Sequence, residues 1–357
     1  MNSDIIVIGG GIAGLSAAAR LSADATVTVL EMESVSGYHA SGRSAALIEE
    51  NYGAPSVQAL NRASMAHFRE GGYLTPRGLM IVAGADDEEA FLADVAHMGV
   101  EQITPREARE MVPVLNERAL AFAGYHAEAY DIDTDRLMQD FIRTLRANGG
   151  QVITDAVVTG IEAQSGGWKV NAGGTFTAGT LVNAAGAWSD LVAGLAGVTP
   201  LGIIPHRRSM ARIAAPGGHD VSKWPMFFGI NESWYAKPDA GALLVSPAEE
   251  VATHPHDAFA DDMTLAEGLD RYQQMVTAPV TRPLATWAGL RSFARDRTLV
   301  LGRDPAVTDF VWCAGQGGYG FQTSPAASAL VADLVTSRAP ALDADTVAAL
   351  SPARFHP

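Results

Sequence analysis

The sequence predicts an α/β protein of two domains, and three observations support this prediction. The first 31 residues read as a buried strand, a glycine-rich turn, a helix and a second buried strand. Further apolar runs typical of buried parallel strands occur at residues 181–185, 299–302 and 310–314. Shorter β-like runs, with arginines in mid-strand, fill residues 201–247. At 357 residues the chain has room for a discontinuous parallel-sheet domain and a second domain with a mixed sheet and helices.

The opening unit is typical of a dinucleotide-binding βαβ motif. Gly9 allows the tight turn after the strand, and Gly11 has no Cβ, so a pyrophosphate can approach the backbone. Gly14 lets the helix pack closely on the strand, and the helix N-terminus favours an anion. Glu31 ends the second strand, where its carboxylate can accept both ribose hydroxyls. A glycine-rich βαβ turn without a ligand is the alternative.

Small residues and one arginine follow this unit at residues 32–46. We expect Ser41 or Gly42 to cap a helix that begins near Arg43. Such a helix would direct a second N-terminus, hydroxyl groups and a guanidinium at the same pyrophosphate. The alternative is an ordinary capped helix with a surface arginine.

Apolar periodicity, caps and glycine turns predict the remaining elements. Thr104 and Asp133 mark two helix starts, and a second glycine loop at residues 315–320 precedes the last helix. We expect helices at residues 56–68, 86–97, 104–108, 133–147, 265–276 and 323–337. We expect strands at residues 78–83, 151–154, 157–161, 168–170, 175–177, 181–185, 201–214, 226–228, 234–236, 243–245, 286–293, 299–302 and 310–314.

Composition excludes several kinds of partner and site. The formal net charge of −15 argues against nucleic acid or an anionic membrane surface as partner. Cys313 is the single cysteine, which excludes an internal disulfide and suits a reducing compartment. We find no basic leader and no membrane-spanning apolar run, and expect a cytoplasmic protein, free or peripheral to the membrane. His254 and His256 lack further ligand spacing, so no metal site is expected.

Five motifs resemble those of the FAD-dependent D-amino-acid oxidase and glycine oxidase superfamily. These are residues 9–14 with Glu31, and residues 41–44, 183–188, 287–291 and 315–320. The likeness extends nearly end to end and is greatest to bacterial D-arginine/D-amino-acid dehydrogenases. It implies a discontinuous Rossmann-like FAD-binding domain and a substrate domain of mixed β-sheet and helices. We place the FAD-binding domain at residues 1–77, 135–200 and 290–357, and the substrate-binding domain at residues 78–134 and 201–289.

The resemblance implies a non-covalent, extended FAD. The first glycine turn would hold the pyrophosphate and Glu31 the adenosine ribose, while the second glycine loop would approach the isoalloxazine. The helix after that loop would direct its N-terminus at the negative N1–C2=O region. The implied cofactor residues are Gly9, Gly11, Ile12, Ala13, Gly14, Glu31, Ser41, Gly42, Arg43, Ser44, Ala45, Val158, Ala185, Gly186, Trp188, Gly289, Gly317, Gly318, Tyr319, Gly320 and Gln322.

On the substrate side, the resemblance implies two arginines that bind a carboxylate. Arg208 and Arg291 match these positions, and a guanidinium fork suits a carboxylate; a surface ion pair is the alternative for either. Tyr52 and Tyr235 match pocket tyrosines, with core packing an equal alternative for Tyr52. These four are the implied catalytic residues. The implied pocket residues are Leu47, Leu79, Met226, Phe228, Gly318 and Gln322.

Two departures from the D-arginine dehydrogenase pattern bear on the substrate. Leu79 stands where that pattern has an acidic residue for the cationic side chain, and Leu47 stands where it has a pocket histidine. Without these polar groups a cationic side chain would be buried unpaired, which is costly. We therefore expect apolar or small substrates, with Met226 and Phe228 extending the apolar wall.

The expected activity is oxidative deamination of a D-amino acid or related amine, with hydride transfer to flavin N5 and release of a 2-keto acid and ammonia. The electron acceptor, oxygen or a quinone-type carrier, and the stereochemistry stay open. One alternative is FAD-dependent oxidation of a 2-hydroxy acid, with His39 or His206 as the base. The other is a flavin-binding electron-transfer subunit without a substrate of its own.

Overall fold

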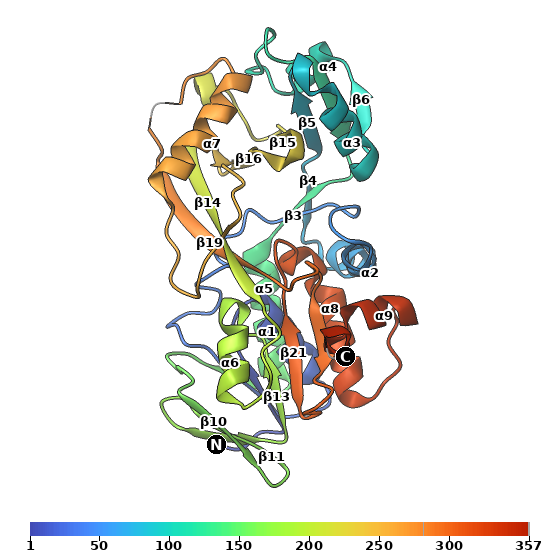
Figure 1. The fold of residues 1–357 in the computed structure, drawn as a ribbon, viewed down its shortest axis with the longest axis vertical. Coiled ribbons are helices and arrows are strands. Elements are labelled where there is room, and N and C mark those ends of the chain that lie inside the picture. Colours follow the sequence, from blue (N-terminus) through green and yellow to red (C-terminus); the bar gives the residue numbers. More distant parts are fainter. Residues whose placement is uncertain (281, 356–357) are drawn as a thin grey trace.

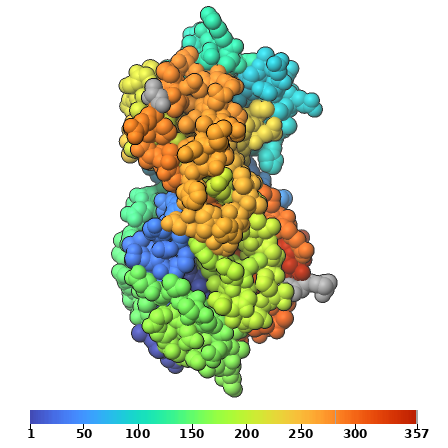
Figure 2. Space-filling model, turned by 60° about the vertical axis from the view of Figure 1, so that its left-hand side comes forward, coloured from blue at the N-terminus to red at the C-terminus, as the bar shows by residue number. Residues whose placement is uncertain are grey.

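The computed structural model describes residues 1–280 and 282–355, whose elements form two lobes joined at a narrower waist (Figures 1 and 2). A mostly parallel sheet organises the lobe at the bottom of Figure 1, and a larger mixed sheet organises the other. Each sheet combines strands from distant parts of the chain. The predicted α/β fold, with a discontinuous parallel-sheet domain and a mixed sheet with helices, is therefore confirmed.

The mostly parallel sheet is covered on both faces. In spatial order its strands are β20 (Val300–Arg303), β21 (Phe310–Ala314), β13 (Thr180–Asn183), β1 (Ile5–Ile8), β2 (Val27–Leu30) and β9 (Gln151–Ile153), with only β20 antiparallel among these six. One helical layer contains α1 (Ile12–Leu21), α2 (Pro55–Gly71), α5 (Thr134–Ala147), α8 (Gly320–Thr336) and α9 (Ala344–Leu350). The opposite face packs on α6 (Ser189–Leu195) and an antiparallel sheet of β10 (Gly160–Gln164), β11 (Gly167–Asn171) and β12 (Thr175–Ala178). Burial on both faces explains the continuous apolar runs of these strands.

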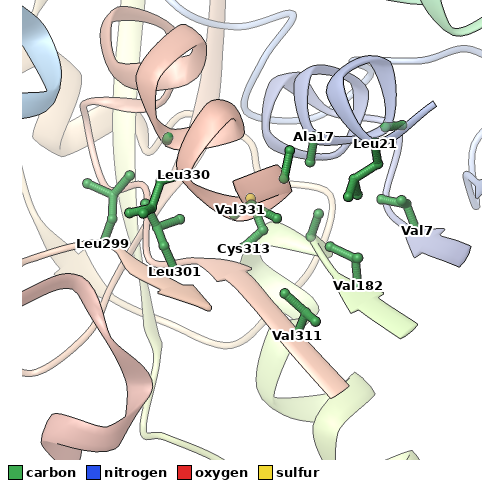
Figure 3. Packing of buried hydrophobic residues seen from close by; sticks show 14 of the residues in the cluster. Val7, Ala17, Leu21, Val182, Leu299, Leu301, Val311, Cys313, Leu330 and Val331 are labelled. Carbon is green, nitrogen blue, oxygen red and sulfur yellow. The ribbon is translucent and has the colours of Figure 1, made fainter. Parts of the chain in front are cut away.

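The core between this sheet and its helices contains the single cysteine (Figure 3). Cys313 lies there with Val311 of the same strand and Val331 of α8. Its side chain is buried, and burial raises the pKa of the thiol to about 12. Because the thiolate is the reactive form, this cysteine is an inert part of the core.

The larger sheet is mixed because β5 and β15 run parallel while the other pairs run antiparallel. Its strands are, in order, β18 (Val251–Ala252), β14 (Ile204–Ala214), β17 (Ala242–Ser246), β16 (Tyr235–Asp239), β15 (Met226–Gly229), β5 (Leu79–Ala83), β7 (Phe122–His126) and β6 (Glu101–Ile103), and β19 (Ala285–Phe293) pairs with β14. The helices of this lobe are α3 (Glu88–Met98), α4 (Pro105–Met111) and α7 (Asp262–Met275).

Side-chain alternation gives the larger sheet two different faces. In β5, Met80 and Val82 pack in the cluster that includes residues of α4 and α7. Leu79 and Ile81 point the other way, into a cluster that contains Phe228 of β15. The second face therefore lies toward the waist and the other lobe.

A small sheet of β3 (Leu47–Ile48), β8 (Tyr130–Ile132) and β4 (Leu74–Pro76) lies at the waist (Figure 1). The predicted helix near Arg43 is wrong, because residues 36–43 form consecutive turns. Gly37 has a left-handed φ of +78°, and its carbonyl accepts the Gly42 N–H at 2.6 Å, which turns the chain back on itself. The helix predicted after the second glycine loop, α8, begins at Gly320 rather than Thr323, so its first turn continues directly from that loop.

Within residues 1–280 and 282–355, no helix combines the length and the apolar character needed to cross a membrane.

Candidate active site

A cavity of about 490 Å³ lies between the parallel sheet and the waist-facing side of the larger sheet. The carboxyl ends of β1, β2, β13 and β21 open into it, since Gly9, Glu31, Ala184 and Gln316 are all part of its wall. In open parallel sheets, ligands bind at this edge. The larger sheet supplies the other wall, so one cavity combines both parts of the predicted site.

At one end of the cavity, two backbone groups orient Glu31. Its Oε2 accepts the Gly10 N–H at 2.6 Å and its Oε1 accepts the Glu33 N–H at 2.9 Å. The carboxylate is thus held at the end of β2, beside the first glycine turn. Val158 and Trp188 line the same cavity.

The first glycine turn depends on close backbone contacts. Gly9 has a φ of +108°, and a Cβ added to Gly14 would lie 1.9 Å from the Gly9 carbonyl oxygen. Gly11 precedes the first turn of α1 and lines the cavity. The Ile12 N–H at that helix start donates to Ser41 Oγ at 3.0 Å, which joins the first cluster of small residues to the second.

Arg43 lines the cavity, but protein groups engage its guanidinium. Nη2 forms an ion pair with Asp257 at 2.5 Å, and Nη1 donates to the carbonyls of Ala258 and Ala288 at 2.8 and 2.9 Å. The hydrogen bond from Arg43 lowers the pKa of Asp257. These contacts fasten the turn segment to β19, and a phosphate contact of Arg43 stays a prediction.

The second glycine loop lies against one of the predicted arginines. A Cβ added to Gly318 would lie 3.0 Å from Cζ and Nη1 of Arg291, so the guanidinium packs on the loop backbone. Gly317, with φ of +52°, donates its N–H to Ser292 O at 2.9 Å. Gly320 and Gln322, in the first turn of α8, also line the cavity. The first N–H groups of a helix have no intrahelical partner, so this end can accept a negative group.

Strand pairing places the two predicted arginines on one face. Arg208 of β14 lies opposite Gly289 of β19, and Arg291 is two residues beyond Gly289 on the same face. This diagonal arrangement corresponds to about 7 to 8 Å between backbone positions. Gly289 has no side chain to separate them, and both arginines line the cavity.

Arg208 is buried and partly satisfied by neighbouring acidic residues. Its Nε donates to Glu249 O at 3.0 Å, and its Nη2 pairs with Glu250 Oε1 at 3.1 Å. Glu250 also binds Arg297 at 2.7 Å. Nη1 has no hydrogen-bond partner within the described chain. The network orients Arg208 and leaves one nitrogen for a ligand.

The predicted tyrosines Tyr52 and Tyr235 line the cavity near an acidic residue that was not foreseen. The Tyr52 hydroxyl donates to Glu232 Oε2 at 3.3 Å, and burial, followed by the charge of Glu232, raises the pKa of this phenol. Asn231 and Glu232 have left-handed φ values of 54° and 49°, which asparagine tolerates but which are uncommon for glutamate. A hydrogen bond of 2.7 Å from the Asn231 N–H to Asp94 Oδ2 holds this turn.

A second acidic residue that the sequence did not predict, Glu49, lies near the predicted apolar wall. Leu79 lies opposite Met226 on one side and His126 on the other. Glu49 lines the cavity near this row, 3% exposed, with its Oε1 3.6 Å from His126 Nε2. Burial raises the pKa of Glu49, although the Asn51 N–H and His126 oppose the change.

This burial predicts a pH-dependent stability difference for Glu49→Gln. With a folded pKa above the unfolded one, the stability from this carboxyl is present below the unfolded pKa and is lost as pH rises through the folded pKa. Gln cannot ionise. We therefore expect the melting temperature of the variant minus that of the wild type to increase by about 2 °C from pH 5 to pH 8. Differential scanning fluorimetry measures this. Glu50→Gln, at a side chain 38% exposed, is the control and should show a smaller gain, because Glu50 acts on the Glu49 carboxyl only through its charge. A difference that shrinks with rising pH would contradict the prediction.

The structure brings almost all the predicted site residues to this one cavity. Those in its wall are Gly9, Gly11, Ile12, Ala13, Glu31, Ser41, Arg43, Ser44, Ala45, Leu47, Tyr52, Leu79, Val158, Ala185, Gly186, Trp188, Arg208, Met226, Phe228, Tyr235, Gly289, Arg291, Gly317, Gly318, Gly320 and Gln322. Gly14, Gly42 and Tyr319 lie outside the wall: the two glycines pack on backbone, and Tyr319 contacts Tyr52 edge-on in the core. Their roles and those of the lining residues stay predictions. The sequence offered no local signal for Glu49 or Glu232, because Glu49 directly follows the two-residue strand β3 and Glu232 ends a single 3₁₀ turn.

Comparison with models of protein families identifies the family of this chain. The model of the FAD dependent oxidoreductase family, DAO, matches residues 4–334. The chain belongs to the DAO family. It is therefore an FAD-dependent oxidoreductase, as the resemblance implied.

Relatives within the DAO family act on different substrates. Glycine oxidase of Geobacillus kaustophilus is 25% identical over 364 residues, covering 95% of this chain and 94% of that enzyme. Its crystal structure matches with a TM-score of 0.82 over 98% of both chains. L-2-hydroxyglutarate dehydrogenase of Escherichia coli K12 is 29% identical over 231 residues, covering 59% of this chain and 54% of that enzyme. L-proline dehydrogenase of P. horikoshii, 24% identical, shares the fold with a TM-score of 0.83 over 99% of this chain and 98% of that one.

The described residues fit the FAD of the DAO family. A Cβ added to Gly11 would lie 3.2 Å from Ser41 Oγ, so its absence keeps backbone exposed beside the first helix start. At the other helix start, Gln322 is 3% exposed, and its Nε2 lacks a hydrogen-bond partner in the described chain. A buried donor of this kind calls for an acceptor from a bound group. Glu31, the two helix starts and this amide would hold the ribose, the pyrophosphate and the flavin edge.

Proposed function

We propose that this DAO-family enzyme oxidises a D-amino acid or related amine that carries a carboxylate, giving a 2-keto acid and ammonia. The single observation that carries the proposal is the pair Arg208 and Arg291, which share one face of the β14–β19 pair, with Arg291 against the second glycine loop. Two guanidinium groups at a buried site suit a carboxylate. The relation to glycine oxidase supports an amino-acid substrate.

The side chains would act mainly by positioning. Arg208 and Arg291 would bind the carboxylate, and Tyr52 and Tyr235 would cover the substrate from the same cavity. This orientation would direct the Cα–H toward the loop at residues 315–320, where Gly318 lies against Arg291. FAD held by the first glycine turn, Glu31 and the start of α8 would supply the two-electron oxidant that accepts a hydride from Cα of the neutral amine. Water then hydrolyses the released imino acid. Because fixed geometry replaces a chance encounter, positioning accounts for much of the rate.

A substrate panel tests the proposal. The holoenzyme is mixed without oxygen with D-leucine, D-methionine, D-lysine, sarcosine, glycine and the L-amino acids, and the oxidised flavin absorbance is followed. We expect bleaching with at least one of the D-amino acids, sarcosine or glycine, and bleaching by L-amino acids alone would contradict the D configuration. Persistent oxidised flavin with all of these compounds would refute the proposal. Repeating the reaction in air, and then with a quinone, distinguishes the two kinds of electron acceptor.

A 2-hydroxy acid is the second candidate, favoured by the match to L-2-hydroxyglutarate dehydrogenase. This reaction needs a base for the hydroxyl proton. His39 lines the cavity, but its Nε2 already pairs with Glu33 at 2.8 Å and its ring contacts Trp188. His206 pairs with Arg291 in the sheet but is absent from the described cavity wall. The candidate therefore ranks second, and bleaching by 2-hydroxyglutarate alone would promote it. Bound FAD that no substrate reduces, but a co-purifying protein does, would indicate an electron-transfer subunit.

A further inference from the structure

Glu49 is a buried carboxylate with an unpartnered oxygen in the cavity wall. It is 3% exposed, and its Oε2 accepts the Asn51 N–H at 3.0 Å. Its Oε1 has no hydrogen-bond partner among the described residues. His126 Nε2, at 3.6 Å, lies beyond hydrogen-bond distance. Since a buried carboxylate without donors is costly, a cavity beside such an oxygen suits a ligand group that brings donors.

Glu49 lies away from the two arginines, where the apolar wall ends. It contacts His126 of β7, which lies opposite Leu79 of β5. Arg208 belongs to β14, and β17, β16 and β15 separate that strand from β5 in the sheet. The charged neighbours of Glu49 are His126, Glu50 and Arg62, whereas Arg208 and Arg291 act on Tyr52. The cavity thus has one end with Arg208, Arg291 and Glu232, an apolar wall, and another end with Glu49.

We propose that Glu49 binds a cationic group, an ammonium or guanidinium, at the tip of the substrate side chain. Leu47, Leu79 and Met226 would contact the methylene stem, while Arg208 and Arg291 hold the carboxylate. This replaces the expectation of an apolar or small side chain, which followed from the two leucines alone. The inference deepens the proposed function and rests on it for the arginine end.

The first test measures binding to the holoenzyme with two ligands that cannot be oxidised. Both 6-aminohexanoate and hexanoate lack an α-amine and a stereocentre, and they differ in the terminal ammonium. By calorimetry we expect 6-aminohexanoate to bind at least 10-fold more tightly, as a charge-assisted hydrogen bond gives. Glu49→Gln should weaken the binding of 6-aminohexanoate by about 10- to 100-fold and change the binding of hexanoate by no more than about threefold. Glu50→Gln removes the same charge one residue away and should change neither.

The second test compares flavin reduction by D-lysine and D-norleucine, whose side chains differ at the tip. Wild-type kcat/KM should favour D-lysine by at least 10-fold, and Glu49→Gln should lower kcat/KM for D-lysine at least 10-fold more than for D-norleucine. Equal binding of the two acids by the wild type, or equal losses for both substrates in Glu49→Gln, would overturn the proposal. If no amino acid bleaches the flavin but 6-aminohexanoate binds through Glu49, the proposed reaction fails and the subsite stands. If D-norleucine is the better substrate, the reaction stands and the subsite fails.

Discussion

Arg291→Met is expected to lower kcat/KM for the amino-acid substrate by about 1000-fold, with FAD content unchanged. A guanidinium fork makes two charge-assisted hydrogen bonds to a carboxylate, each contributing about 1.5 to 3 kcal/mol in a buried site. A factor of 10 corresponds to about 1.4 kcal/mol. The neighbouring Glu232 would also lose its cationic neighbour, which adds to the loss. Stopped-flow reduction of the flavin measures the effect.

Arg208→Met should behave similarly, and Arg212→Met is the matched control. Arg212 lies on the same strand, but it pairs with Asp239 at 3.1 Å and is absent from the described cavity wall. Partly exposed ion pairs of this kind contribute about 1 kcal/mol or less. We expect the control to retain kcat/KM within about threefold. A loss below 10-fold in both Arg208→Met and Arg291→Met would refute the carboxylate site.

Gly14→Ala is expected to yield protein that retains about a tenth or less of its FAD after purification. The new Cβ would lie 1.9 Å from the Gly9 carbonyl oxygen, so α1 must move away from β1. Overpacking of this kind costs about 1 to 3 kcal/mol, and displacement of the helix start removes its N–H groups from the ligand. The ratio of absorbance at the flavin and protein bands measures retention.

The control for this prediction is Gly194→Ala. Gly194 is in α6, and a Cβ there meets no atom within 4 Å. Alanine is the better helix former, so we expect unchanged FAD content and a stability gain of at most about 1 kcal/mol. Full FAD retention by Gly14→Ala would show that this close contact does not position the cofactor site.

Local patterns predicted much of the fold. The opening βαβ unit, the helix capped by Asp133 and the glycine loop before α8 were correct, because each depends on residues close in sequence. The helix near Arg43 was wrong for a tertiary reason. Arg43 is held by Asp257, far along the chain, and Gly37 turns the backbone, so capping residues there serve turns instead of a helix.

The site, like the fold, combines features that depend on residues close in sequence with features that depend on tertiary contacts. Glycine spacing and strand periodicity are local properties, so they were sufficient to predict a parallel-sheet nucleotide unit, a second glycine loop and, through the family likeness, FAD. The entry of Glu49 and Glu232 into the cavity depends instead on tertiary packing. Glu49 becomes a candidate ligand group because its buried Oε1 lacks a hydrogen-bond partner among the described residues and lies 3.6 Å from His126 Nε2. Pairing of β7 with β5 places that histidine beside Leu79. Burial and the separation of charged groups in space arise from packing between distant segments, and no short pattern records them.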